Sequence, residues 1–323
     1  MKKAVKSLEL EPLTSPAHVT WEITRACNFQ CIHCYNNSGK ELTNELSHDE
    51  KLRVAKQLVD AKIFSVCLSG GEPILCKSFW EISRILKDGE IQNNTITNGY
   101  FINERTASIY AKFFENIQLS IHGANSKTHD KITGIKGSWK KATNACNLLK
   151  NNSAKIYVST TLLYYNLKEI SDVIDLSYKA GAYGWRGSSA IWTGRAALNY
   201  PILNMTKKQY SDLEKEISKK KMEYGKALSI EYTFDPLQND IMDEFKKNIP
   251  TMCCISPTGV CSLFSFLPFS GGSLRDIKFE KAWGKLMQIY KNPIFFELLN
   301  SFKKNENFLK MKKIPYLEGE YFE

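Results

Sequence analysis

Residues 64–99, FSVCLSGGEPILCKSFWEISRILKDGEIQNNTITNG, contain two short β-rich runs separated by a glycine turn and an amphipathic segment. The runs at 64–70 and 94–99 are typical of buried strands, and the apolar spacing within 78–89 is typical of a helix. A strand, a helix and a second strand in succession favour a right-handed crossover between two parallel strands. This stretch therefore predicts one βαβ unit of a parallel sheet.

The same alternation continues on both sides of this unit. An amphipathic helix is predicted at 48–61, and four more strands are predicted at 19–24, 117–123, 155–164 and 182–188. Six parallel strands are two short of a closed eight-stranded barrel. We therefore predict the α/β class, as an open six-stranded parallel (β/α)6 partial barrel with a small C-terminal α+β module.

The pattern changes after about residue 200. A charged helix is predicted at 205–225, a short strand at 228–234 and another helix at 235–248, before a compact segment that contains cysteine. The predicted divisions are an N-terminal extension at 1–17, a core domain at 18–200, a helical bridge at 201–250 and the C-terminal module at 251–323.

Composition limits the compartment and the partners. The chain has 323 residues with 43% hydrophobic and 24% charged residues, and it shows neither a signal sequence nor a membrane-length apolar run. We expect a cytoplasmic protein, in which nine cysteines do not form a disulfide framework. The net charge of +10 is spread along the chain, and its densest segment, at 302–313, reads as a solvated helix face. We expect no nucleic acid and no membrane as partner.

Three cysteines lie within CNFQCIHC, namely Cys27, Cys31 and Cys34. Closed metal sites and iron–sulfur clusters usually take four protein ligands. Three thiolates on a [4Fe–4S] cube leave one iron open for another ligand. A zinc site with His33 or a distant residue as the fourth ligand is the alternative at this point.

Other motifs lie at the ends of successive predicted strands. The cysteine loop follows the first strand, SGGEP (69–73) ends the second, TNG (97–99) the third and SIHG (120–123) the fourth. The carboxyl ends of parallel strands share one edge of a sheet, where ligands bind. These motifs are therefore expected to form one site, although GGEP by itself also fits a plain turn.

Together the motifs resemble the radical S-adenosylmethionine (SAM) superfamily over roughly residues 17–200. The loop fits C-x3-C-x-aromatic-C with His33 in the aromatic position, and SGGEP begins 35 residues after Cys34. The resemblance implies a [4Fe–4S] cluster on Cys27, Cys31 and Cys34, whose open iron binds the amino and carboxylate groups of SAM. It also implies reductive cleavage of SAM to a 5′-deoxyadenosyl radical that abstracts hydrogen from a substrate.

The resemblance also assigns residues to SAM. The backbone of the two glycines approaches the amino group, with the following glutamate assisting. The residues after the third and fourth strands face the ribose, and the histidine and the fifth strand face the adenine. The arginine after the sixth strand pairs with the carboxylate, unless it is a surface or helix-capping residue. The residues so assigned are His33, Gly70, Gly71, Glu72, Pro73, Asn98, Ser120 and Arg195.

The C-terminal module resembles a shortened auxiliary-cluster domain of the SPASM or twitch type. CCISPTGVC (253–261), GGSLRD (271–276) and FEKAW (279–283) follow its outline, but no cysteine follows Cys261. Three interpretations stay open: a second cluster with an open iron, a lost cluster, or a thiol that donates a hydrogen atom. The candidates for a second cluster are Cys253, Cys254 and Cys261, and the candidate hydrogen donors are Cys253 and Cys254, which as neighbours cannot easily reach one cube together.

The remaining candidates have simpler interpretations. Cys67 in a strand, Cys76 at a helix start and Cys146 in a helix are interpreted as small buried side chains. The pair His129–Asp130 is similar to a metal phosphohydrolase motif, but it lacks a partner set and is interpreted as part of a loop or a helix start.

The expected function is that of a radical SAM enzyme that modifies a ribosomally synthesised peptide by cross-linking, epimerisation or oxidation. One alternative is a small-molecule task in tetrapyrrole or other cofactor biosynthesis. Another is a non-catalytic iron–sulfur or zinc protein, against which the intact GGEP motif argues. The expected partners are the peptide, or a small-molecule precursor, and an electron donor such as ferredoxin or flavodoxin. Only about 17 residues precede the first predicted strand, so no leader-binding domain is expected there.

Overall fold

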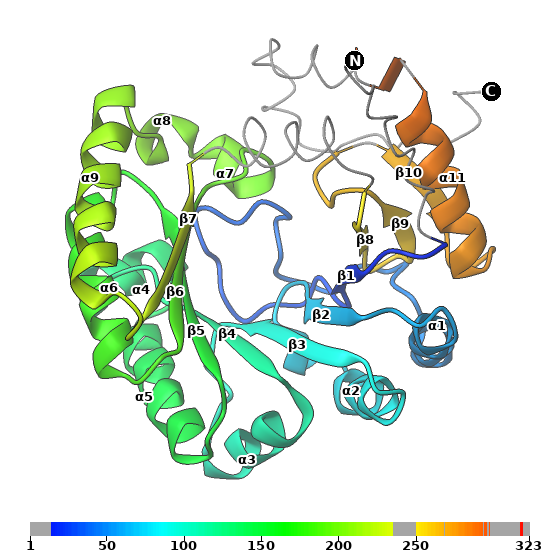
Figure 1. Ribbon diagram of the computed structural model, residues 1–323, viewed down its shortest axis with the longest axis horizontal. Coiled ribbons are helices and arrows are strands. Elements are labelled where there is room, and N and C mark those ends of the chain that lie inside the picture. Colours follow the sequence, from blue (N-terminus) through cyan, green and yellow to red (C-terminus); the bar gives the residue numbers. More distant parts are fainter. Residues whose placement is uncertain are drawn as a thin grey trace, which may run out of the picture.

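One curved sheet connects both parts of the chain in the computed structural model (Figure 1). The structure describes residues 14–234, 250–267, 269–292, 294–295 and 297, and the backbone at 317–318. Among these residues the sheet has eleven strands, in the order β11-β10-β9-β8-β1-β2-β3-β4-β5-β6-β7.

All six predicted barrel strands are present, and they are parallel. The strand predicted at 228–234 pairs in parallel with the sixth strand and extends the barrel wall. The seven wall strands are β1 (His18–Glu22), β2 (Ser65–Ser69), β3 (Gln92–Thr97), β4 (Asn116–Ser120), β5 (Ile156–Leu162), β6 (Gly184–Ser189) and β7 (Ser229–Thr233). The open α/β partial barrel is therefore confirmed, with one more strand than the sequence indicated.

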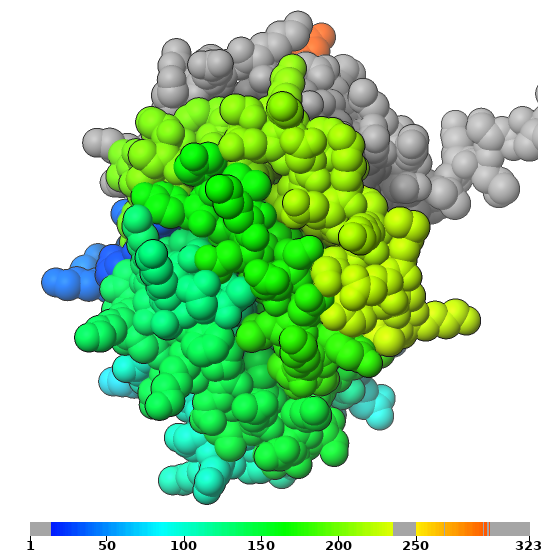
Figure 2. Space-filling view, turned by 90° about the vertical axis from the view of Figure 1, so that its left-hand side faces the viewer, coloured from blue at the N-terminus to red at the C-terminus, as the bar shows by residue number. Residues whose placement is uncertain are grey.

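Helices cover the convex side of this wall, and Figure 1 shows the loop after β1 on the concave side. The capping box of Ser47 and Glu50 explains where the first helix begins. The helices are α1 (His48–Asp60), α2 (Phe79–Asp88), α3 (Glu104–Phe113), α4 (Ser126–Thr133), α5 (Ser138–Asn151), α6 (Ile170–Lys179), α7 (Gly194–Leu198), α8 (Tyr200–Leu203) and α9 (Lys207–Tyr224), with 3-10 turns η1 (Pro73–Leu75) and η2 (Leu167–Glu169). In Figure 2 the green and yellow-green residues from α4 to α9 cover the side that it shows.

The C-terminal strands extend the same sheet from its other edge. Strand β8 (Met252–Ile255) pairs in parallel with β1, and β9 (Val260–Ser262) pairs antiparallel with β8. Next to them lie β10 (Phe269–Ser273), helix α11 (Phe279–Lys291) and β11 (Leu317–Glu318). The helices predicted at 235–248 and 302–313 lie outside the described residues.

Alternation along the strands separates an apolar outer face from a polar inner one. On β1, Val19 and Trp21 are buried in the core beneath the helices, whereas Thr20 faces the concave side. On the inner face of the neighbouring strands, the Asn116 side chain donates to that of Asn94 at 2.7 Å. The barrel lumen is therefore lined with polar groups. No helix among the described residues is long and apolar enough to cross a membrane.

Candidate functional site

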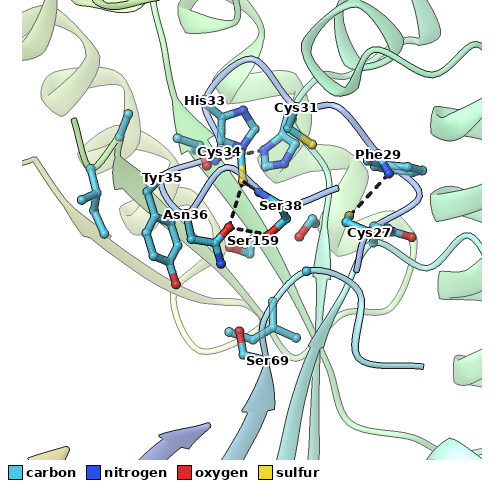
Figure 3. Close-up of a pocket in the computed structure, with 18 of the residues that line it drawn as sticks. Cys27, Phe29, Cys31, His33, Cys34, Tyr35, Asn36, Ser38, Ser69 and Ser159 are labelled. Carbon is cyan, nitrogen blue, oxygen red and sulfur yellow. Dashed lines mark hydrogen bonds between the residues drawn. The ribbon is translucent and has the colours of Figure 1, made fainter. Parts of the chain in front are cut away.

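A cavity of about 300 Å³ lies at the carboxyl ends of the barrel strands. Its lining includes the side chains of Cys27, Cys31 and Cys34 (Figure 3). The expected meeting of the strand-end motifs therefore occurs. The predicted residues that line this cavity together with the three cysteines are His33, Gly70, Gly71, Asn98, Ser120 and Arg195.

Backbone hydrogen bonds hold the cysteine loop on the barrel. The amide of Ile32 donates to Ile132 in α4 at 2.9 Å, and the amide of Cys27 donates to Gly39 at 2.8 Å. Two further amides point at sulfur: Phe29 N–H to Cys27 Sγ at 3.4 Å, and Ser38 N–H to Cys34 Sγ at 3.3 Å (Figure 3). Such donors favour the thiolate form that a metal needs.

Burial acts on Cys27 and Cys31 in the opposite direction. It raises the pKa of Cys27 to about 11 and raises the pKa of Cys31 further above its ordinary value. Cys27 and Cys31 are therefore protonated in the protein without metal, and metal loading must release their protons.

The donor set fits a [4Fe–4S] cluster better than a single ion. In the described part of the chain, no three His, Cys, Asp or Glu side chains are placed to hold one metal ion, and this includes the loop thiols. In a cluster each thiolate binds a different iron, so three thiols around one cavity suffice. The arrangement therefore does not favour the zinc alternative.

The two glycines pack the GGEP turn against the chain that leads into the cysteine loop. Gly71 N–H donates to the Thr24 carbonyl at 2.7 Å, and Glu72 N–H donates to the Ala26 carbonyl at 2.8 Å. A Cβ on Gly71 would clash with the Ala26 carbonyl oxygen, and Gly70 adopts a φ of +131°. The glycines are thus needed for this contact as well as for any close approach to a ligand.

The Glu72 side chain supports the end of β3. One carboxylate oxygen accepts the Thr97 hydroxyl at 2.7 Å, and the other accepts the Asn98 amide at 2.8 Å. Burial raises the pKa of Glu72 to about 7. Neither Glu72 nor Pro73 is among the described residues that line the cavity. Glu72 therefore positions Asn98, whose side chain also donates to that of Asn28 at 2.8 Å.

Arg195 binds the cysteine loop. Its Nε donates to the Cys31 carbonyl at 2.8 Å, and its Nη1 donates to the Ser38 carbonyl at 2.7 Å. Its backbone amide donates to the Cys34 carbonyl at 2.9 Å. The preceding Gly194 has a φ of +56°, and a Cβ there would clash with the Tyr35 carbonyl. This contact holds the loop shape, while the predicted pairing of Arg195 with a carboxylate ligand stays a prediction.

Two histidine rings lie together at the cavity wall. His33 and His122 meet edge to face, with ring centroids 4.4 Å apart. Burial lowers the pKa of His33 to about 3, so the ring is neutral. Its Nδ1 is buried and has no hydrogen-bond partner among the described residues, which leaves it available to a ligand. The SIHG motif contained His122, but the sequence did not indicate this pairing.

A buried acidic pair beside the cavity was missed by the sequence interpretation. The Tyr35 hydroxyl donates a short hydrogen bond to the Glu22 carboxylate. Burial raises the pKa of Glu22 and that of Tyr35. The glutamate inside the strand run VTWEIT was the available signal, because a charged residue rarely lies in a buried strand without a partner.

The C-terminal cysteines lie on two neighbouring strands: Cys253 and Cys254 point to opposite faces of β8, and Cys261 lies on β9. Cys253 and Cys261 are fully buried in the hydrophobic core, with their sulfurs 3.9 Å apart. Cys254 lies next to Thr20 of β1, on the lumen face. Burial, and to a smaller extent the nearby Glu22, raise the pKa of its thiol. The structure therefore brings two of these three thiols together and separates the third.

The other candidates are placed as follows. Cys76 and Cys146 are buried, whereas Cys67 is partly exposed on the lumen face of β2. Cys76 ends the turn η1. The interpretation of His129–Asp130 as a loop or helix start is wrong, because the pair lies inside α4. There Asp130 accepts the amides of Gly137 and Trp139, which fixes the turn into α5.

Sequence comparison relates the chain to known proteins. Residues 21–177 match the model described as the Radical SAM superfamily. The chain is 29% identical over 191 residues to the sporulation killing factor maturation protein SkfB of Bacillus subtilis, covering 59% of this chain and 46% of SkfB. It is 24% identical over 287 residues to the AdoMet-dependent heme synthase of Methanosarcina barkeri, covering 83% of this chain and 82% of that protein.

Structure comparison gives the same fold. SuiB of Streptococcus suis bound to S-adenosylmethionine has a TM-score of 0.70 at 13% identity, covering 92% of this chain and 72% of SuiB. SuiB bound to its precursor peptide SuiA has a TM-score of 0.71 at 13% identity, covering 89% and 67%. The chain thus shares most of its fold with SuiB, while its sequence match covers less than half of SkfB.

Proposed function

Because residues 21–177 form a radical SAM domain, we propose that this enzyme modifies a ribosomally synthesised peptide by cross-linking, epimerisation or oxidation. The observation that carries the proposal is the cavity that joins three loop thiols to Gly70, Asn98 and Ser120. Support for a peptide comes from SkfB, which is named as a maturation protein, and from SuiB, which was solved with a precursor peptide.

The residues that line the cavity would have separate roles in this reaction. Cys27, Cys31 and Cys34 would hold a [4Fe–4S] cluster, and Asn98 and Ser120 would face the ribose of SAM. When bound, the cluster and SAM supply a 5′-deoxyadenosyl radical that abstracts hydrogen from the substrate. A ferredoxin or flavodoxin would deliver the electron.

We also propose that the enzyme holds a single cluster. All nine cysteines of the sequence lie in the described residues, so the other residues of this chain cannot supply a further thiolate. Cys253 and Cys261 face the core, and Cys254 faces the lumen. Without a second cluster to accept an electron, return of a hydrogen atom to the substrate is favoured, and epimerisation becomes the preferred outcome.

The test is anaerobic reconstitution with iron, sulfide and SAM, together with a low-potential reductant. The peptides to be tried are those encoded by any short open reading frames that neighbour the gene. Formation of 5′-deoxyadenosine with a mass or stereochemical change in the peptide is expected. Deoxyadenosine with an unchanged peptide would contradict the peptide proposal, and absence of deoxyadenosine from a cluster-loaded protein would contradict radical chemistry in this chain.

A second candidate is a reaction on a tetrapyrrole or another cofactor precursor. The observation that favours it is the match to the heme synthase, which spans 83% of this chain, against 59% for SkfB. Incubation of the reconstituted enzyme with iron tetrapyrroles, and separately with the peptide, distinguishes the two candidates. A change in the mass of a tetrapyrrole, with 5′-deoxyadenosine formed and the peptide unchanged, would support this candidate over the peptide.

A further inference from the structure

A second cavity, of about 340 Å³, opens inside the barrel next to the first. The two cavities share Ser159 of β5 and Ser188 of β6 in their lining. Its other walls include Gln118 of β4, Arg186 of β6 and Glu231 of β7. None of these three residues has a role in the SAM site described above. A substrate that reaches the first cavity through the lumen would therefore contact them.

Arg186 and Glu231 form an ion pair that faces this cavity. Arg186 Nε donates to Glu231 at 3.0 Å, and Nη1 donates to the Gln118 side chain at 3.4 Å. The guanidinium lies over the Tyr157 ring, 4.2 Å from its centroid. The side chains remain 43% and 56% exposed, respectively, so a ligand can reach both. The pair is thus oriented by its neighbours and still accessible.

The pair presents a donor and an acceptor side by side with no net charge. Arg186 Nη2 makes no hydrogen bond within the described residues, so its N–H groups are free to donate. Glu231 accepts from Arg186 and from Ser229, the latter at 3.2 Å, and a carboxylate has further lone pairs. A peptide group offers the matching carbonyl and N–H. A free carboxylate would instead meet repulsion from Glu231.

We propose that Arg186 and Glu231 bind an uncharged amide of the substrate, either a backbone peptide group or an Asn or Gln side chain. Arg186 and Ser188 are two residues apart on β6, which is about 7 Å along a strand. The bound amide therefore lies one or two substrate residues from the carbon that faces the first cavity, and it sets which residue is modified. This inference rests on the proposal that the substrate is a peptide.

The test measures binding of two probes to the reconstituted, SAM-bound enzyme by equilibrium dialysis. The probes are N-acetylalanine methylamide, which is neutral and has two amide groups, and glutarate, a dicarboxylate. The methylamide is expected to bind more tightly. Glu231→Gln should weaken the methylamide about tenfold and strengthen glutarate, because the repulsion is removed. Arg186→Lys should weaken the methylamide severalfold, because the planar fork is lost.

Matched controls come from the exposed pair of Arg84 and Glu81 on α2, whose side chains lie 3.8 Å apart. Arg84→Lys and Glu81→Gln should leave the binding of both probes unchanged. Tighter binding of glutarate to the unaltered enzyme, equal binding of the two probes, or a methylamide affinity unaffected by Glu231→Gln would each overturn the inference.

Peptide modification is followed separately, so that the two proposals fail independently. If the probes behave as expected and the peptide is unchanged, the subsite stands and the peptide reaction fails. If the peptide is modified and glutarate binds better, the reaction stands and the amide subsite fails.

Discussion

Arg195, at the start of α7, donates its Nε to the carbonyl oxygen of Cys31 at 2.8 Å. The two residues are 164 positions apart. Through this bond, and those to Ser38 and Asn37, the segment after β6 fixes the shape of the cysteine loop after β1. The first and sixth strands of an open barrel are not neighbours, so this contact ties the cluster site to the far side of the wall.

Replacing Arg195 with Lys should therefore lower cluster loading. Lysine keeps the positive charge but cannot make the same fork of hydrogen bonds to two carbonyls. We expect iron content after reconstitution to fall severalfold while circular dichroism stays unchanged. The control is Arg84→Lys on exposed α2, which should load normally. Normal iron content in Arg195→Lys would show that the loop keeps its shape without this contact.

The raised pKa of Glu72 predicts a pH-dependent stability. The folded value of about 7 lies above the ordinary value of 4.5. The folded state therefore binds this proton more tightly than the unfolded state. The stabilisation is complete below pH 4.5 and is lost as the pH rises through 7. The difference corresponds to about 3 kcal/mol in the free energy of unfolding.

Urea denaturation of the protein without cluster, at pH 5 and pH 8, measures this effect. Glu72→Gln should remove most of the pH-dependent difference, and Glu81→Gln, which is exposed, should not. The unaltered protein and Glu72→Gln share all other titrating groups. The difference between their free energies of unfolding at each pH therefore isolates the contribution of Glu72. Parallel curves for the protein and Glu72→Gln would be inconsistent with the raised pKa.

The sequence predicted those strands and helices that are specified by residue patterns within the segment itself. Short apolar runs indicate the six strands, and amphipathic segments indicate the helices between them. Because the strands are parallel, their carboxyl ends share one edge, which places Cys27, Cys31 and Cys34 there. The strand at 228–234 was recognised, but its place beside β6 was not, because a single short strand carries no signal for its partner. The same holds for β8, whose pairing with β1 depends on contacts more than 200 residues apart.

Residue roles were harder to predict than residue positions. The motif assigned Glu72 to assist SAM binding, which stays a prediction, but it did not indicate that this carboxylate accepts hydrogen bonds from the Thr97 hydroxyl and the Asn98 amide. Arg195 likewise donates hydrogen bonds to the carbonyl oxygens of Cys31 and Ser38, which come within reach only when the loop is folded. Whether Cys253 and Cys254 share a face follows from strand alternation, which becomes visible only when β8 is known to be a strand.

Two sets of cysteine substitutions should give opposite results. Replacing Cys27, Cys31 and Cys34 with Ala should remove the brown chromophore and reduce the iron content from about four per chain to near zero. Replacing Cys253 and Cys261 with Ala should leave the iron content unchanged. It should lower the free energy of unfolding by about 2 kcal/mol, because two buried sulfurs are lost from the core. An iron content near eight in the unaltered protein would contradict the single-cluster proposal.

Cys254 is expected to donate the hydrogen atom that ends the reaction. Its neighbour on β1, Thr20, lines the first cavity, and burial raises the pKa of Cys254 to about 12, so the thiol keeps its hydrogen. In the proposed step the S–H bond breaks and a C–H bond forms at the substrate radical. One electron from the proposed ferredoxin or flavodoxin, with one proton, would then restore the thiol.

Since thiol hydrogens exchange with solvent, a reaction in D2O should place one deuterium at the modified carbon of the peptide, as measured by mass spectrometry. Cys254→Ala should reduce this deuterium incorporation at least tenfold while 5′-deoxyadenosine still forms. The matched control is Cys253→Ala, which removes the adjacent thiol from the core face and should keep the deuterium signal. Equal deuterium incorporation in Cys254→Ala and the unaltered enzyme would assign the hydrogen donor to another group.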